Sequence, residues 1–307
     1  MPHTIWLLFA FSGPVLWAIS THIDKYLVER FFKTRSVAAL LVFTPFISIA
    51  MLPFIAVFGP NVLQLDIRSI LLVTSSGILY MGAMHFYLAA LQNDEASVVV
   101  PYFQVTPVFG ALMAYLFLGQ ILTPRQIGGG ALVILGALLL SLKPGPRPHR
   151  FRFRFRLLVL MLACAFAVAA SSVIFAVFAI RTDFWPTAFW TYAGESVYGF
   201  ALLGFANIRR QFISLFTGNI ASILSISAVN ELLNLGGGLG TRYALLLAPL
   251  GLVQAIGSTG PLFVFLFGAG LTLLLPKFGR ENLSLPNLFQ KGAAATLVAA
   301  GVTFISV

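Results

Sequence analysis

A carboxyl group stands inside a long apolar run, in SAVNELLNLGGGLGTR from Ser227 onward. On a helix, Ser227 lies one turn before Glu231 and Asn234 lies almost one turn after it, so the three side chains share one face, with Asn230 adjacent. A carboxyl in such surroundings can carry a proton or pair with a cation. The alternative is a carboxyl that is satisfied by hydrogen bonds between packed helices.

Other reactive side chains also lie in apolar stretches. Glu195, in FWTYAGESVYG, is flanked by Tyr192 and Tyr198. Rings beside a carboxylate could stack on and neutralise an organic cation, although ordinary packing explains them equally well. His85, in YMGAMHFYLAAL, is the one histidine well inside an apolar run, and it could titrate near neutral pH or be purely structural.

Two neutral amides precede prolines in comparable stretches of the chain. Gln104 stands three residues before Pro107, and Gln254 stands seven before Pro261. An amide can contact a polar ligand without the free-energy cost of a buried charge. We therefore count both among the candidate binding residues.

Prolines and glycines mark places where a helix could bend or unwind. A proline removes a backbone donor and clashes one turn back, and a glycine triplet can unwind to expose carbonyls. The predicted break points are Pro101, Pro107, Pro261, Gly236, Gly237 and Gly238. The triplet is not a phosphate-binding loop, because no strand precedes it and no Gly-Lys-Ser/Thr follows it.

The composition places these residues in a membrane. The chain has 307 residues, of which 59% are hydrophobic and 9% charged, with a mean hydropathy of +0.95; soluble proteins carry about 25% charged residues. A spanning helix needs about 20 apolar residues. We predict an all-α integral membrane protein with ten transmembrane helices: Ile5–Ile23, Ser36–Phe58, Ser69–Leu91, Ala96–Leu118, Gln126–Leu142, Leu157–Ile180, Trp185–Phe205, Ile220–Leu247, Pro249–Leu275 and Leu288–Ser306.

Few residue types are available for metal or covalent chemistry. The single cysteine, Cys164, rules out an internal disulfide and a cysteine cluster. No second histidine or paired carboxylate stands at metal-ligand spacing, and the four histidines are scattered. We expect no metal, no cofactor and no enzymatic activity. The N-terminus lacks a basic region and an Ala-x-Ala site, so we predict a first span rather than a signal peptide.

Five predicted spans lie on each side of a basic segment. Residues 1–142 form a first five-helix repeat, residues 143–156 (KPGPRPHRFRFRFR) a linker, and residues 157–307 a second repeat. With an odd number of spans, the second repeat enters the membrane inverted. Inverted repeats place a binding site near the midplane, where the halves meet.

Positive charge is distributed unevenly between the predicted loops. Of nineteen Lys and Arg residues, fifteen follow odd-numbered spans, and only Arg68, Arg125, Arg181 and Arg242 follow even-numbered ones. By the positive-inside rule both termini face outward. The net charge of +10 is thus an orientation signal and not a nucleic-acid footprint, and the Arg-Phe alternation of the linker suits contact with membrane lipid.

Several short motifs, made of small residues and prolines, resemble those of a known family. The segment ALQNDEAS, then VVVP, AYLFLG and LTPRQIGGGALVILGALLLSL, resembles the third to fifth helices of an EamA-type member of the drug/metabolite transporter superfamily, and YALLLAP resembles the matching part of the second half. The resemblance implies a ten-helix bundle that moves small solutes by alternating access, usually outward, without an ATP site. It also implies that spans five and ten are scaffold.

The resulting expectation is a secondary active transporter in the cell (inner or plasma) membrane, as a monomer or homodimer. It would export a small metabolite, an amino acid-like solute or a drug-like compound, with proton coupling as one option. The alternatives are a lipid-intermediate flippase and a non-transporting receptor or assembly subunit. Members of the resembled family are commonly drawn with both termini in the cytoplasm, which is the reverse of what the charges indicate.

The charge bias predicts that a tag fused after Val307 is accessible to antibody on intact cells, whereas a tag inserted in the linker 143–156 becomes accessible only after lysis. Flow cytometry of intact and permeabilised cells measures both. A C-terminal tag that is protected until lysis contradicts the predicted orientation.

Overall fold

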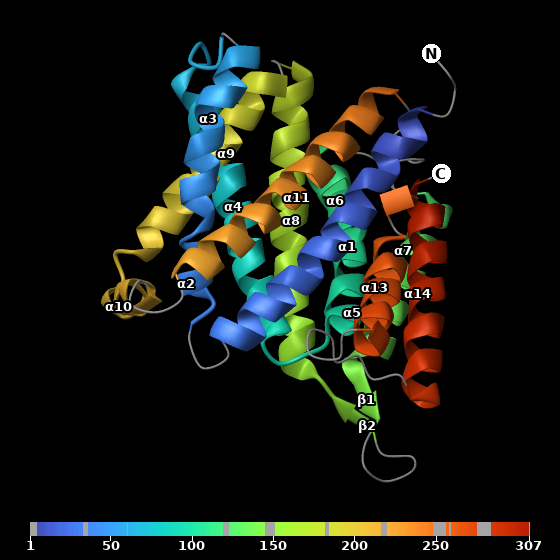
Figure 1. Ribbon diagram of the computed structural model, residues 1–307. Helices are drawn as coiled ribbons and strands as arrows, with labels where there is room; N and C mark the ends of the chain where they lie inside the picture. Colours follow the sequence, from blue (N-terminus) through green and yellow to red (C-terminus); the bar gives the residue numbers. More distant parts are fainter. Residues whose placement is uncertain are drawn as a thin grey trace.

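The chain folds into a bundle of helices (Figure 1). The computed structural model describes residues 5–32, 36–59, 61–118, 123–144, 151–181, 184–215, 220–247, 256–257, 259–274 and 284–306. The first half comprises α1 (Ile5–Phe31), α2 (Ala38–Leu41), α3 (Thr44–Phe58), α4 (Ile67–Leu91), α5 (Ala96–Val99), the 3₁₀ helix η1 (Val100–Val105), α6 (Thr106–Leu118) and α7 (Pro124–Ser141). The rest comprises β1 (Leu142–Pro144), β2 (Phe151–Phe153), α8 (Phe155–Arg181), α9 (Phe184–Leu202), α10 (Ala206–Leu215), α11 (Ile220–Leu247), α13 (Gly260–Leu274) and α14 (Leu285–Ser306).

Apolar helices confirm the predicted membrane character. Among the described residues, five helical segments are long and apolar enough to cross a membrane: Ile5–Phe31, Ala38–Val57, Ile67–Leu91, Ala96–Met113 and Phe155–Phe175. The other five predicted spans fall on α7, α9, α11, α13 and α14. A multi-pass membrane protein follows, and ten crossings stay a prediction.

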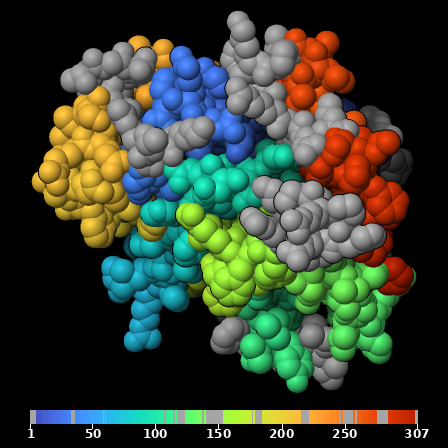
Figure 2. All heavy atoms as spheres, turned by 90° about the horizontal axis from the view of Figure 1, so that it is seen from below, coloured from blue at the N-terminus to red at the C-terminus, as the bar shows by residue number. Residues whose placement is uncertain are grey.

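Two elements depart from the predicted plan of ten helices joined by loops. The basic linker contributes an antiparallel ribbon in which Leu142 pairs with Phe153 and Pro144 with Phe151. The alternation of Arg and Phe has the period of two that suits a strand. The second departure is α10, which follows α9 where a loop was expected; it lies against α2 and protrudes at one edge of the face seen from below (Figure 2).

The first helix is longer than predicted. It was expected to end at Ile23, but α1 continues to Phe31. Leu27 and Val28 are fully buried, and Lys25 pairs with Glu29 one turn on, at 3.2 Å. Asp24 therefore lies within the bundle and not at the end of a helix.

Helices of the two halves interleave instead of forming separate bundles. From the first half, α1 packs on α11 and α13, α3 on α9, α4 on α8 and α9, α6 on α8, and α7 on α14. The start of α1 and the end of α14 lie at the same end of the bundle, and the ribbon lies at the opposite end (Figure 1). Any cavity between the halves is consequently lined by both.

All three predicted proline break points stand at the second residue of a helical segment. Pro101 is the second residue of η1, Pro107 of α6 and Pro261 of α13. Near Pro101 the helix passes from α to 3₁₀ geometry, and near Pro107 it returns to α geometry, with no residue between the segments. The predicted fourth span is thus three segments, α5, η1 and α6, whereas α11 runs unbroken through Gly236, Gly237 and Gly238.

Glycine lets α4 and α9 cross with their backbones in contact. A Cβ on Gly77 would collide with the carbonyl oxygen of Thr191, and one on Gly194 would collide with that of Thr74. Ser76 Oγ lies 3.3 Å from Thr191 Oγ1 across the same crossing. Small residues are what helices in lipid use to approach closely.

Gly77→Ala is expected to destabilise the protein by roughly 1–3 kcal/mol, because its Cβ has no room at this crossing. Gly82→Ala, five residues further along α4, is the matched control: no atom lies within 4 Å of its added Cβ, and helix propensity alone favours alanine. Thermal unfolding in detergent compares the two. A Gly77→Ala midpoint at or above that of the wild type contradicts the tight crossing.

Candidate functional site

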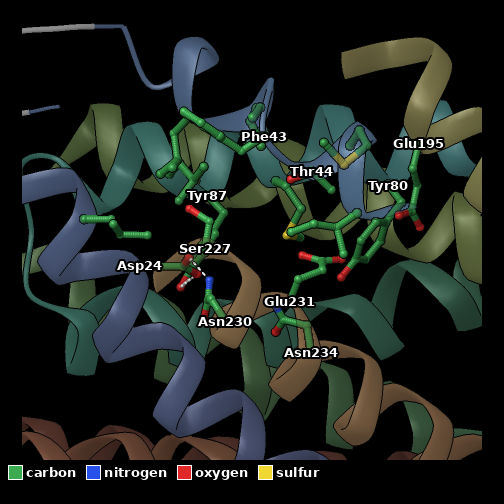
Figure 3. A pocket seen from close by; sticks show the side chains of 17 residues that line it. Asp24, Phe43, Thr44, Tyr80, Tyr87, Glu195, Ser227, Asn230, Glu231 and Asn234 are labelled. Carbon is green, nitrogen blue, oxygen red and sulfur yellow. Dashed lines mark hydrogen bonds between the residues drawn. The ribbon is translucent and has the colours of Figure 1, made fainter. Parts of the chain in front are cut away.

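A cavity of about 80 Å³ lies between α1, α2, α3, α4, α9 and α11, and thus between the two halves (Figure 3). It exceeds the ~10–15 Å³ that one ordered water needs and is smaller than the ~300–1,000 Å³ of typical ligand pockets. Among the described residues, none from α7 or α14 lines the cavity. The cavity is therefore a narrow internal site at the interface of the halves.

Three carboxyl groups line this cavity: Asp24 from α1, Glu195 from α9 and Glu231 from α11. Asn230, Asn234 and Ser227 join them from α11, along the face predicted from the sequence. In Figure 3 the labelled side chains converge on the cavity from several helices. This concentration of polar groups is exceptional in a chain with 9% charged residues.

Asp24 is held by hydrogen bonds from two other helices. Asn230 Nδ2 donates to Asp24 Oδ1 at 2.7 Å, and the Tyr87 hydroxyl donates to Asp24 Oδ2 at 3.2 Å. Ser20 Oγ donates to Asn234 Oδ1 at 2.8 Å, a second link between α1 and α11. These contacts fix the carboxylate and orient both asparagine amides.

Two buried polar atoms of α11 at the cavity lack a hydrogen-bond partner in the part of the chain that the structure describes. They are Ser227 Oγ and Asn230 Oδ1, whose residues are 8% and 7% exposed. Both residues line the cavity. A buried polar atom left unpaired costs about 1–3 kcal/mol, so the site has unused hydrogen-bonding capacity.

No Lys, Arg or His is among the described residues that line the cavity. Lys25, next to Asp24 in sequence, instead donates to the backbone carbonyls of Leu91 and Asp94, at 2.6 and 2.7 Å. The cavity therefore has carboxyl groups but no basic side chain of its own to balance them.

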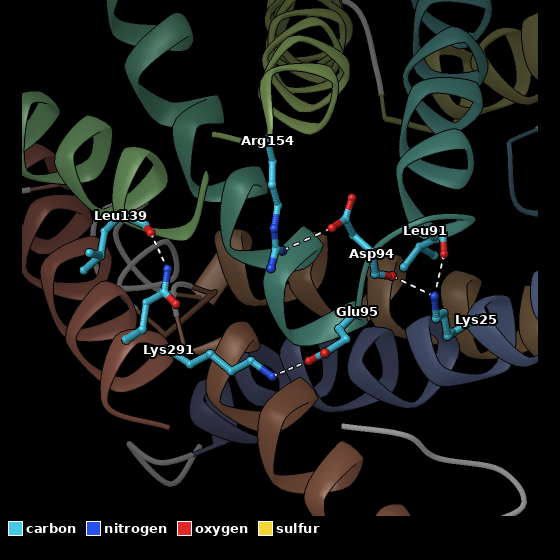
Figure 4. Close-up of polar contacts among 8 residues, drawn as sticks. Lys25, Leu91, Asp94, Glu95, Leu139, Arg154 and Lys291 are labelled. Carbon is cyan, nitrogen blue, oxygen red and sulfur yellow. Dashed lines mark hydrogen bonds and ion pairs between the residues drawn. The ribbon is translucent and has the colours of Figure 1, made fainter. Parts of the chain in front are cut away.

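A separate set of ionic contacts holds the turn between α4 and α5 (Figure 4). Asp94 pairs with Arg154 at 3.1 Å, and Glu95 pairs with the buried Lys291 of α14 at 2.6 Å. With the Lys25 contacts, these pairs join the turn to α1, to the segment before α8 and to α14. The acids of this turn fasten the ribbon end of the bundle.

The predicted site residues are only partly brought together. Glu231, Asn230, Asn234 and Glu195 meet at the cavity. Three others do not line it: His85, whose Nδ1 lies 3.0 Å from the Tyr198 hydroxyl, Tyr192 on α9 and Gln104 on η1. Gln254 lies outside the described residues.

The predicted break points of α11 serve packing in this structure. Added Cβ atoms on Gly236 and Gly237 would press on Leu16 and Trp17 of α1, at 3.2 and 2.9 Å, whereas Gly238 has open space. The triplet lets α11 approach α1, which brings Asn230 within reach of Asp24. Its predicted unwinding is not seen.

Asp24 is the site residue that the sequence interpretation missed. The predicted first span ends at Ile23, one residue before Asp24, so this acid fell outside the predicted membrane spans. Leu27 and Val28 continue the apolar face of α1 beyond that point, and this spacing is the signal that a longer helix carries an acid inside it.

Metal binding finds no support in the geometry. Within the described ranges, no group of three or more His, Cys, Asp or Glu side chains is placed to hold a metal ion. The cavity carboxyls are accompanied by amides, a hydroxyl and tyrosines. Their arrangement suits protons and polar organic groups.

Comparison with known proteins agrees with this architecture. Residues 4–142 match the EamA-like transporter family, which confirms the resemblance carried by the motifs of the first half. Eleven chains of solved structures match; one, described as "Crystal structure of protein", is 17% identical, with a TM-score of 0.53 over 97% of this chain and 94% of its own. That likeness shows a shared fold. No curated protein matches the sequence.

The hydrogen bond between Asn230 and Asp24 predicts an energetic coupling between α11 and α1. Asn230→Ala should destabilise the protein by about 1–3 kcal/mol, because it removes a donor from a buried carboxylate. A double-mutant cycle with Asp24→Ala, measured by thermal unfolding, should give a coupling of roughly 0.5–3 kcal/mol. Additive effects of the two substitutions contradict a direct contact.

Proposed function

We propose that this chain, whose residues 4–142 match the EamA-like transporter family, is a secondary active transporter that carries a small solute across the cell membrane by alternating access. The observation that carries the proposal is the cavity between the halves, lined by Asp24, Glu195 and Glu231. Ionisable groups inside a membrane protein are costly and usually mark a substrate or proton pathway. Export is inferred from the family resemblance.

Helix pairing supports an inverted repeat. In a five-plus-five repeat, α1, α4 and α6 correspond to α8, α11 and α13. The contact between α1 and α11 then has the contact between α8 and α4 as its counterpart. The contact between α1 and α13 has the contact between α8 and α6 as its counterpart. All four contacts occur. In the same repeat α3 corresponds to α9 and α7 to α14, so each of these pairs joins two equivalent helices. Both pairs are in contact.

The crossing of α4 on α9 differs from its counterpart, and this difference supports alternating access. The tight crossing of α4 on α9 corresponds to a crossing of α11 on α3, yet α11 and α3 touch only slightly. The cavity lies in the space between them, lined by Thr44 and Ile47 of α3 and by Glu231 of α11. If the tight crossing moved from α4 and α9 to α11 and α3, and back again, the cavity would open alternately to the two sides of the membrane.

Proton coupling is assigned to Asp24 and Glu231. They line one cavity, and the charge of Asp24 acts on Glu231. Two carboxylates in a low-dielectric site repel one another, and a proton on one of them relieves the repulsion. Loss or gain of that proton therefore changes the charge of the site by one unit during a transport cycle.

Glu231→Gln is expected to abolish solute-driven proton flux, because an amide cannot release a proton. The measurement uses proteoliposomes loaded with a pH-sensitive dye and an imposed gradient of mixed amino acids, amines and nucleosides. Glu29→Gln is the matched control, since Glu29 lies on α1 with its side chain 48% exposed, and surface ion pairs contribute about 0–1 kcal/mol.

Both variants should keep the wild-type elution profile in size-exclusion chromatography. Undiminished flux in Glu231→Gln contradicts the coupling role of this residue. Loss of flux in Glu29→Gln as well would assign the effect to charge in general and not to the cavity.

A further inference from the structure

We infer that the cavity between α1, α4, α9 and α11 is a binding site for a compact organic cation with an N–H donor, a protonated amine attached to an apolar group. The inference rests on the proposed transport function and names its substrate class. Three properties of the lining carry it: its charge, its unpaired acceptors and its apolar wall.

The charge of the lining favours a cation. Asp24, Glu195 and Glu231 approach the cavity from three helices, and the described residues that line it include no basic side chain. Asp24 and Glu231 are partly buried, and a charge with limited access to water is costly unless it is paired or hydrogen-bonded. A ligand ammonium group supplies the positive charge, whereas a ligand carboxylate would be repelled and would find no guanidinium or ammonium to bind it.

The unpaired acceptors favour a ligand that donates hydrogen bonds. Asn230 uses its Nδ2 on Asp24 at 2.7 Å, which fixes the amide and leaves Oδ1 facing no donor. Ser227 Oγ, one turn earlier on α11, is likewise unpaired. An ammonium group has two or three N–H donors, which matches a carboxylate and these two oxygens together; a quaternary ammonium has none.

The remaining wall is apolar, aromatic and sulfur-containing. Phe43 of the α2–α3 segment and Met81, Met84, Tyr80 and Tyr87 of α4 line it. Aromatic faces attract cations, and methionine adapts to varied apolar shapes. An amine with a small hydrocarbon or aryl group would place its nitrogen toward Asp24 and Asn230 and its apolar part toward α4.

The same geometry separates amines from amino acids. A zwitterionic amino acid carries the ammonium group but also a carboxylate, which the three lining carboxyls would repel in a poorly solvated site. Free amino acids are therefore expected to be excluded, although they share the size and the apolar group of the corresponding amines.

Four matched probes test the inference with purified wild-type protein in detergent at pH 7.5: 2-phenylethylamine, its N-trimethyl quaternary analogue, 2-phenylethanol and phenylalanine. A ligand that binds the folded state raises the unfolding temperature. The amine should raise it in a saturable manner, the quaternary analogue should bind at least tenfold more weakly, and the alcohol and the zwitterion should have no effect. Phenylalanine or the alcohol binding as tightly as the amine overturns the inference.

Variants place the binding in the cavity. Glu231→Gln and Asp24→Asn should each weaken amine binding at least tenfold, and Ser227→Ala about threefold to tenfold. Glu29→Gln on the exposed side of α1 should leave it unchanged. Ser227→Ala removes one oxygen and no charge, so it tests the site even where a carboxyl variant fails to fold. Amine affinity unchanged in all three cavity variants overturns the assignment.

The binding readout is independent of transport. Amine binding without any solute-driven proton flux would retain the cation site and contradict the proposed function. Flux driven only by neutral or zwitterionic solutes would retain the transporter and overturn its substrate class.

Discussion

The structure depends on the hydrogen bond from Asn230 to Asp24, because it satisfies a carboxylate that lipid would not tolerate alone. The contact joins α11 of the second half to α1 of the first, at 2.7 Å. It needs the close approach of these helices, which the glycines at 236 and 237 permit against Leu16 and Trp17. The bond uses the amide nitrogen of Asn230 and leaves its Oδ1 without a partner among the described residues. Asn230 thus links the two halves and, in the proposed binding site, supplies an acceptor.

A second set of polar contacts also joins distant parts of the chain, since acids of the first half pair with basic residues that come later in the sequence. The α4–α5 turn contributes Asp94 and Glu95, and their basic partners come from the segment before α8 and from α14. These pairs lie at the ribbon end, whereas the described residues that line the cavity include no Lys, Arg or His. The ion pairs of the turn thus fasten the fold, and the carboxyls of the cavity are the groups to which the proposed function assigns protons and solute.

Much of this architecture follows from the sequence. Composition predicted the membrane fold, and the spacing of Ser227, Asn230, Glu231 and Asn234 predicted a polar helix face that does line the cavity. Glu195 was recovered because an acid in an apolar run is costly. His85 was assigned as a titratable group inside an apolar run, Tyr192 as a ring beside Glu195, and Gln104 as an amide before a proline, but none of the three lines the cavity. The rotation of each helix about its axis is set by packing between helices. Asp24 was missed because the predicted first helix ended at Ile23, more than two turns before Phe31, where α1 ends. The ribbon was missed because the period-two pattern of Arg and Phe was attributed to lipid contact.

The crossing of α4 and α9 has a kinetic consequence. Gly77 and Gly194 bring two backbones together with no side chain between them at that point. Two backbones in direct contact can part without the rotamer changes that interdigitated side chains require. The barrier to parting these helices is then set by shallow dispersion contacts and the Ser76–Thr191 hydroxyl pair, and not by repacking a core. A membrane helix pair that is tight in geometry can therefore be fast in motion.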